Sequence, residues 1–365
     1  MMRGSSRQQG SGRRVDEMVT MADVAARAGV SVSTVSHVVN GTRPVSAESS
    51  ARVREAIEAS GYVPNAVARS LATSSTNLIG VVMSATSNPL FGPLFSAVEE
   101  AARRRGFNLL LADSHEQAKL EQEQVQVMLN HQVAGLVLAP AGSGSVRLLD
   151  ALDARHVPTI LIDRFADDRF DQVGTENVAS TAELVGHLAD RGHRRIAFIS
   201  GRRSISTTAE RLAGYRAGLE AAGLPFDAAL IRCGQSLAAP ARHATQRLLG
   251  LPQPPTAIVS GNNEMTLGML RGIRDAGLRV PYDIAAAAFD DVEWADLIEP
   301  GMTVQSQDVA AIGHTAVNLL VQRIRGGRGR PERRHIDPEF VHRSSCGCDP
   351  EIAAPLPEAD LPATA

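Results

Sequence analysis

Seven short apolar runs, spread between residues 78 and 289, constrain the fold of this 365-residue chain more than any other feature. Each run has the length of a strand and is almost continuously hydrophobic, which is typical of parallel strands buried on both faces. Segments with helical spacing separate the runs, so the pattern predicts βαβ units and an α/β core. The runs are LIGVVMS, FNLLLAD, GLVLAP, PTILID, RIAFIS, TAIVSG and IAAAAF, and the helical segments include 95–105, 117–131, 181–191 and 209–222.

Before this core, residues 19–40 read VTMADVAARAGVSVSTVSHVVN and predict two short helices joined by a tight turn. Thr20 is the expected N-cap of the first helix, whose apolar residues recur at i, i+3, i+4 and i+7. Gly29 can adopt the positive φ that ends this helix, and Ser31 can cap a second helix that begins near Val32. The pair predicts a helix-turn-helix, whose second helix lies in the major groove of DNA.

The second helix has a buried stripe and an outward face. Its last three valines form the stripe, whereas small polar residues and His37 point away from it. The outward residues are the expected readers of base edges, and hydroxyls such as those of Thr34 and Ser36 can bond phosphates. An ordinary helical hairpin without DNA function is the alternative. The residues of this motif expected at DNA are Thr20, Val32, Ser33, Thr34, Ser36, His37 and Asn40.

A third helix is expected from the N-cap Ser46 to a stop at Gly61, which completes a small all-α head over residues 19–64. The following residues, YVPNAVARSLA, begin a further helix that threonines and serines end after about two turns. A helix this short is marginal in water, where roughly 12 residues or more are needed, so it should order only against a partner. Residues 65–76 are therefore expected to be a hinge helix and linker.

Five ordered motifs give the chain a resemblance to a known family: TMADVAARAGVSVSTVSHVVN, GYVPNAVARSLAT, RLAGY, SGNNEMTLG and FDD. On these motifs, residues 19–345 resemble the LacI/GalR family of bacterial transcription regulators. The resemblance implies that the hinge helix folds in the minor groove when two subunits bring their copies together. Leu71 would be a wedge that unstacks a base step, although packing on the core is its alternative fate. Asn65 and Arg69 would also lie at the DNA, with Arg69 holding phosphates.

His37 departs from the family pattern in a way that affects operator choice. Many relatives carry Arg near the end of the SxxTVSxVVN run, and Arg is the commonest bidentate reader of guanine. His37 can make one bond to a base edge or lie beside a phosphate. We therefore expect a changed half-site or weaker direct readout.

By the same resemblance, the core divides into two lobes like those of a periplasmic sugar-binding protein. The first lobe is expected over 77–176 plus 306–341, and the second over 177–305. Ligands of open parallel sheets bind outside the carboxyl ends of the strands, so the cleft between the lobes is the expected effector site. The core is expected to end at 345, with disordered tails at 1–18 and 346–365.

Polar residues follow several of the apolar runs. Arg211 provides a rigid fork of donors and Asp290 accepts from hydroxyls, a combination that suits a polyhydroxylated ligand. Phe91 could stack on a sugar ring or a planar base. Alternatively, Arg211 and Asp290 pair with each other across the cleft, and Asn263 only caps the following helix. The contact positions of the family map onto Phe91, Thr207, Arg211, Asn263 and Asp290.

Three residues bear on the class of effector. Asn263 stands where relatives usually have Asp, and the loss of that negative charge would tolerate an anionic ligand better. Ile205 replaces a polar residue of purine-responsive relatives, and Leu90, rather than an aromatic residue, lies beside Phe91. We therefore expect a sugar or a sugar acid, with a purine or nucleoside as the alternative. Trp294 is expected to pack beneath the cleft.

Charge and composition agree with an intracellular regulator. Residues 1–75 hold 9 Lys/Arg against 6 Asp/Glu, a net charge of +3, whereas the whole chain has −3. This difference suits a DNA-binding head on an acidic body, although a difference of this size also arises on ordinary solvated surfaces. The N-terminus lacks the apolar run of a secretory signal, and no apolar stretch of 18 or more residues exists. We expect a cytoplasmic protein without membrane contact.

Metal and catalytic patterns are weak. Cys233, Cys346 and Cys348 are too scattered for a disulfide framework, and a C-x-C pair with one distant Cys lacks a fourth zinc ligand, so free thiols and no metal are expected. Asp290 and Asp291 are adjacent carboxylates, which tend to point apart, whereas a glycosidase needs a controlled separation. The HExxH, P-loop and GxSxG motifs are absent. We expect neither catalysis nor a cofactor.

These observations favour a homodimeric repressor that reads a near-palindromic operator on double-stranded DNA. A small-molecule effector in the cleft would shift the first lobes, separate the hinge helices and loosen DNA binding. A sugar-binding or sugar-processing protein without DNA function is the other alternative, and it leaves the head unexplained.

Overall fold

The computed structural model describes residues 19–40, 43–62 and 76–348. They form two compact units, divided between Thr76 and Asn77. The predicted hinge contacts Asn65, Arg69 and Leu71 lie outside the described residues, as do the expected N-terminal tail and residues 349–365.

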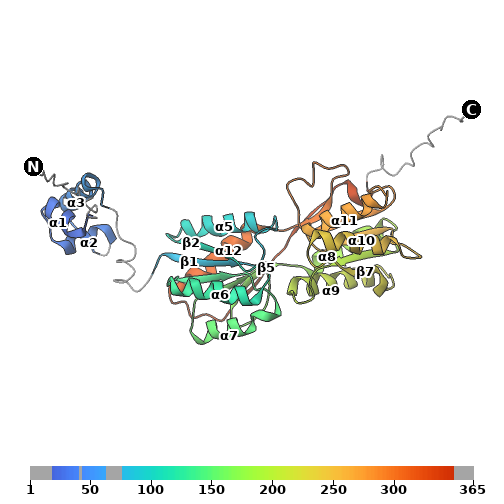
Figure 1. The fold of residues 1–365 in the computed structure, drawn as a ribbon, viewed down its shortest axis with the longest axis horizontal. Coiled ribbons are helices and arrows are strands. Elements are labelled where there is room, and N and C mark those ends of the chain that lie inside the picture. Colours follow the sequence, from blue (N-terminus) through green and yellow to red (C-terminus); the bar gives the residue numbers. More distant parts are fainter. Residues whose placement is uncertain (1–18, 41–42, 63–75, 349–365) are drawn as a thin grey trace, which may run out of the picture. The chain divides into compact units, whose positions relative to one another are not determined.

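The first unit is a three-helix head formed by α1 (Met21–Ala28), α2 (Val32–Asn40) and α3 (Ala47–Ser60) (Figure 1). Thr20 caps α1 through a capping box, in which the Asp23 backbone N–H donates to Thr20 Oγ1 and the Thr20 N–H donates to the Asp23 carboxylate. Gly29 ends α1 with a φ of 64°. These caps, and the cap of α3 by Ser46, confirm the predicted boundaries. The small core of the head is made by Val24, Ala25, Ala28, Val35, Val53, Ala56 and Tyr62.

The first sheet of the second unit consists of six parallel strands in the order β11-β5-β4-β3-β1-β2. Helices α5 and α12 cover one face and α6 and α7 the other, each burying apolar side chains against the sheet. The strands are β1 (Leu78–Met83), β2 (Asn108–Asp113), β3 (Gly135–Leu138), β4 (Thr159–Ile162), β5 (Asp171–Thr175) and β11 (Arg333–Ile336). The helices are α5 (Phe91–Arg103), α6 (Ala118–Asn130), α7 (Val146–Ala154) and α12 (Val309–Ile324).

The second sheet has the order β12-β10-β9-β8-β6-β7 and is parallel except for β12, which pairs antiparallel with β10. Helices α8 and α9 cover one face, and α10 and α11 the other. The strands are β6 (Ile196–Ser200), β7 (Ile231–Cys233), β8 (Ala257–Ser260), β9 (Ala285–Phe289), β10 (Thr303–Ser306) and β12 (Glu339–Val341). The helices are α8 (Val178–Asp190), α9 (Ser206–Ala221), α10 (Ala238–Leu249) and α11 (Asn263–Asp275).

All seven predicted strands are present, whereas β5, β7, β10, β11 and β12 were not predicted. These five strands are short or carry polar residues, as in DQVGT and RRHI, so they lack the continuous apolar signal of the others. Three helices also begin earlier than predicted, and one of them is α8, which begins at Val178 rather than at residue 181. The α5 helix begins at Phe91 rather than at residue 95, and α9 begins at Ser206 rather than at 209.

The expected lobe and core ends need correction. The chain passes between the sheets after β5, after β10 and again after β11, so β12 belongs to the second lobe and not to the first. The expected first lobe therefore extends too far when it includes 339–341. Cys346 is 1% exposed in the core of the second lobe, so the segment assigned to a tail from 346 onward begins inside the folded core. No helix among the described residues has the length and apolarity needed to span a membrane.

Candidate functional site

The head presents the first turn of α2 on its surface. Val32 is 47% exposed, and Ser33 is exposed beside it, while Val35 is fully buried under the same helix. The hydroxyl of Thr34 lies 2.8 Å from Ser31 Oγ, which also accepts the Thr34 backbone N–H at 3.1 Å. The Thr34 hydroxyl, which was expected at a phosphate, is thus bonded to the Ser31 oxygen that caps α2.

The middle of α2 is less exposed than its start. Ser36 and His37 are both half-buried. Asn40 is the last residue of the helix. The predicted readers therefore lie on one short helix, as expected, and this geometry presents an apolar Val32 and hydroxyls, rather than a guanidinium fork, at the N-terminal end of α2.

Arg211 on α9 is the central cation of the second lobe. It is only 6% exposed. Its Nε donates to Asn177 Oδ1 at 2.7 Å, its Nη1 donates to the Gly261 carbonyl at 2.6 Å, and the guanidinium lies 3.6 Å over the ring centroid of Phe289. Nη2 lies 3.8 Å from Asp290 Oδ1. Burial lowers the pKa of Arg211, against the attraction of Asp290. The fork is rigidly held, with one end directed at Asp290.

Asp290 follows β9 directly and has a φ of 73°, a strained value for a residue other than glycine. Its Oδ2 accepts the backbone N–H of Asn263 at 3.3 Å, and its Oδ1 accepts from Gln307 Nε2 at 2.6 Å. Gln307 lies in the segment that crosses between the lobes, where it also bonds Thr175. Asp290 therefore links the cleft to the interlobe crossings. The pairing of Arg211 with Asp290 is confirmed, but within the second lobe and not across the cleft as expected.

Asn263 is the first residue of α11 and does not cap it. The cap is Asn262, whose side chain accepts from the Met265 N–H at 2.8 Å. Asn263 instead donates from Nδ2 to Asn88 Oδ1 in the first lobe at 3.0 Å. The N-cap falls one residue earlier than the expected alternative placed it, and Asn263 Oδ1 accepts the Glu264 backbone N–H at 2.7 Å. Its amide bridges the two lobes.

The first lobe supplies a charged set that the sequence interpretation missed. Asp163 follows β4 and has a φ of 69°, so it occupies the same place on the first sheet as Asp290 on the second. Arg164 is 7% exposed, and its Nη1 and Nη2 donate to the Glu116 carboxylate at 2.9 and 2.6 Å. Its Nη1 also donates to the Pro140 carbonyl. Arg164 Nε lies 3.2 Å from Asp163 Oδ2. Burial raises the pKa of the Asp163 carboxyl. The available signal was Asp163 at the end of the run PTILID and Arg164 directly after it.

These residues enclose a cavity of about 230 Å³ between the carboxyl ends of the two sheets. Of the predicted ligand contacts, Phe91, Thr207, Arg211 and Asp290 line the cavity, and Asn263 is buried behind the lining. Trp294 is not among the lining residues. Further polar lining comes from Ser87, Asn88, Glu116, Asp163, Arg164, Arg202, Thr208, Gln235, Ser236, Asn262 and Glu264.

Most of the residues that line the cavity are polar or charged, and one is aromatic. Phe91 is the single aromatic side chain among the described lining residues, and Leu90 and Ile205 line the wall near it. The charged lining residues include both signs, and most are already paired within the protein. A ligand that enters must therefore satisfy many donors and acceptors without a large net charge.

The cysteine expectation also needs correction. The C-x-C pair does not lack further donors, because His187 from α8 and His342 lie with Cys346 and Cys348, all donor atoms being within 4.8 Å of one another. Sequence spacing could not reveal this cluster, since His187 is far from the other three residues along the chain.

Comparisons with known proteins find relatives of both the head and the two-lobed core. Residues 20–65 match the model described as "Bacterial regulatory proteins, lacI family", and residues 185–346 match the "Periplasmic binding protein-like domain". The ribose operon repressor of Escherichia coli (strain K12) is 33% identical over 329 residues, which cover 90% of this chain and 100% of that protein. The HTH-type transcriptional repressor PurR of Erwinia tasmaniensis is 33% identical over 336 residues, which cover 91% of this chain and 98% of the relative.

Solved structures give the same result. A lac repressor dimer bound to operator and the anti-inducer ONPF is 28% identical, with a TM-score of 0.81, over 90% of this chain and 99% of that one. A complex of the transcriptional regulator CelR with cellobiose is 31% identical, with a TM-score of 0.69, over the same shares of the two chains. The fold predicted from sequence, a helix-turn-helix head with a two-lobed α/β core, is confirmed.

Proposed function

This chain belongs to the lacI family of bacterial regulatory proteins, and we propose that its interlobe cleft takes a sugar or a sugar acid as effector. The protein is a ligand-controlled DNA-binding repressor and not an enzyme. What remains to be assigned is the chemical class of the effector, the residues that hold it and the path from cleft to DNA.

The composition of the cleft carries the proposal. A cavity of about 230 Å³ is small beside the roughly 300–1,000 Å³ of typical sites for drug-sized ligands, which favours a monosaccharide-sized effector. Arg211, Asp290 and Asp163 offer donors and acceptors from both lobes, and buried hydroxyls of a ligand need such partners. Phe91 supplies one apolar face for the ring of a sugar. A purine would favour stacking on both faces, but Leu90 and Ile205 stand near Phe91.

The route from cleft to DNA begins at Asp290. A ligand hydroxyl that bonds Asp290 competes with Gln307, whose segment crosses between the lobes and contacts Thr175. Asn263 and Asn88 add a direct bond between the lobes. Closure of the cleft would therefore shift the crossing segments. A coupling free energy of about 1–3 kcal/mol between effector and DNA is typical of such linkage.

We infer a cytoplasmic homodimer that reads a near-palindromic operator, since two-fold protein symmetry requires two-fold half-sites. The lac repressor relative is described as a dimer on operator. In this chain, the edge strand β2 leaves Leu111 43% exposed, which supports an apolar contact at the first lobe. By family resemblance, Leu71 of each copy would enter the minor groove, and His37 would alter the half-site.

A thermal-shift screen tests the effector class. Purified protein is heated with pentoses, hexoses, their uronic and aldonic acids, and with hypoxanthine and guanine. A sugar or sugar acid is expected to raise the melting temperature, and the Arg211→Lys variant should lose this shift because lysine keeps the charge but not the fork. The Arg216→Lys variant, exposed on the same helix, serves as the control and should retain the shift. Stabilisation by purines alone would favour the alternative effector class.

A further inference from the structure

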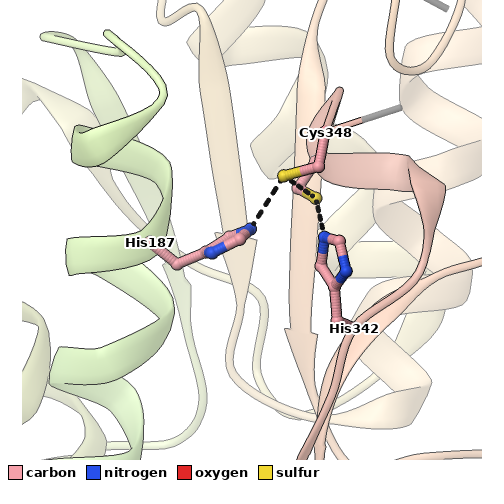
Figure 2. Close-up of side chains that lie close together, drawn as sticks. His187, His342 and Cys348 are labelled. Carbon is pink, nitrogen blue, oxygen red and sulfur yellow. Dashed lines mark hydrogen bonds between the residues drawn. The ribbon is translucent and has the colours of Figure 1, made fainter. Parts of the chain in front are cut away.

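Four side chains with metal-binding atoms meet on the second lobe, away from the cleft. His187 comes from α8, and His342, Cys346 and Cys348 come from the segment that follows β12. Figure 2 shows the two imidazole rings approaching the pair of sulfur atoms from different elements. None of the four residues lines the effector cavity.

The separations come within about 1 Å of those of a tetrahedral metal site. Cys346 Sγ lies 3.3 Å from His342 Nε2, Cys348 Sγ lies 3.2 Å from His187 Nε2, and the two sulfurs are 3.0 Å apart. All four donor atoms lie within 4.8 Å of one another. In tetrahedral zinc, bond lengths of about 2.3 Å to sulfur and 2.0–2.1 Å to nitrogen put the ligand atoms ~3.3–3.8 Å apart. Only small side-chain adjustments would separate the sulfurs and admit the ion.

The local backbone brings the two cysteines to one side. Gly347 between them has a φ of 77°, a left-handed conformation that lets both side chains turn toward the same point. The preceding Ser345 is fully buried, where its Oγ donates to the Ala286 carbonyl and accepts the Thr303 N–H. The segment is thus held against β9 and β10, independently of any ion.

His187, the donor on α8, is also held in place by the surrounding structure. His187 belongs to α8, whose neighbouring Leu184 and Leu188 are fully buried against the second sheet. Its ring contacts Phe340 and His342, with centroids 5.2 Å from each. Because rigid elements position donors more precisely than free loops do, the cluster is organised before metal binding.

We propose that His187, His342, Cys346 and Cys348 form a structural Zn²⁺ site that joins the C-terminal segment to α8. Two thiolates and two imidazoles are a soft-to-borderline donor set in a closed tetrahedral arrangement, which selects Zn²⁺ over hard cations. With four protein ligands, no position remains open for substrate, so the ion stabilises the lobe. Binding releases the thiol protons as the thiolates form.

A metal titration of the full-length chain, made without a histidine tag, tests the site. After chelation and desalting under reducing conditions, the protein is titrated with Co²⁺ as a spectroscopic probe. The expected result is a thiolate-to-cobalt charge-transfer band and intense visible bands of tetrahedral cobalt, saturating at about one ion per chain. Zn²⁺ should then displace Co²⁺ and bleach both features.

Matched variants identify the ligands. Cys348→Ser and His187→Asn should each abolish the charge-transfer spectrum or reduce it strongly, whereas Cys233→Ser and His243→Asn, on exposed residues outside the cluster, should leave it unchanged. Zn²⁺ should also slow alkylation of the half-buried Cys348 but not of the exposed Cys233.

Three results would overturn the proposal without recourse to a variant. One is wild-type protein that binds neither Co²⁺ nor Zn²⁺ near stoichiometry under reducing conditions. Another is metal binding that leaves the alkylation rate of Cys348 unchanged. If peptide mapping of non-reduced protein finds a Cys346–Cys348 disulfide that zinc does not prevent, the pair is a redox couple and the zinc site is refuted.

Discussion

Replacing Arg211 by alanine removes the cation that three buried groups share. Asn177 Oδ1 and the Gly261 carbonyl would each lose a donor, and Asp290 would lose its cation. Leaving a buried acceptor unsatisfied costs about 1–3 kcal/mol. Breaking a buried ion pair from one side costs about 3–5 kcal/mol, and this figure overlaps with the first because the same side chain is removed.

We therefore expect Arg211→Ala to lower the free energy of unfolding of the second unit by about 3–5 kcal/mol. At about 2–4 °C per kcal/mol for a domain of 150–250 residues, the melting temperature falls by roughly 6–20 °C. Differential scanning calorimetry and urea unfolding measure both quantities. The separately folded head should keep its affinity for non-specific DNA, while the effector response is lost.

The control is Arg216→Ala on the same helix, where the exposed guanidinium only stacks on Phe226 at 4.8 Å. Such an exposed contact contributes about 0.5–1 kcal/mol. A loss for Arg211→Ala no larger than that of the control would refute the assignment of Arg211 as a buried, paired ion. An intact effector response in the Arg211→Ala protein would separately refute its role as a ligand contact.

Three further changes probe the head and the cleft. Thr20→Ala removes the capping box of α1 and should lower the stability of the head by about 1 kcal/mol, measured by chemical unfolding; no change would show that the cap is dispensable. His37→Arg should shift the preferred half-site toward guanine in a selection from random DNA, and an unchanged profile would mean that residue 37 does not read bases. Asn263→Asp should weaken binding of sugar acids more than of neutral sugars, by calorimetric titration, because it restores a negative charge behind the cleft; equal losses would count against contact at this position.

The elements that could be predicted were those marked by a pattern of neighbouring residues, such as an apolar run or a helix cap. Continuous apolar runs identified most of the strands, whereas β5 is buried along its whole length but carries polar residues and was missed. The caps of the head were also predictable, because Thr20 and Gly29 act on the residues next to them. The edge strand β11 was missed because its partner β5 lies far along the chain, and β7 was missed because it has only three residues, IRC, with no apolar run.

In the cleft, too, residues in local motifs were predicted and residues that depend on distant contacts were missed. Arg211 and Asp290 were predicted because each lies in a recognisable motif, and the structure brings both to the cavity. The network of Asp163, Arg164 and Glu116 was missed, although Asp163 directly follows a predicted strand. Its identity depends on a contact between residues 116 and 164 that no local pattern encodes. The cluster of His187 with the C-terminal cysteines was missed for the same reason.

The central claim is that a ligand in the cleft controls the affinity of the head for a two-fold DNA site. The most direct test is footprinting of genomic fragments with purified protein, followed by fluorescence anisotropy on the protected site with and without the stabilising ligand from the thermal screen. The account predicts a protected inverted repeat and a change in operator affinity of about 5–150-fold on ligand binding. An unprotected fragment set, or an operator affinity that the bound ligand leaves unchanged, would contradict it.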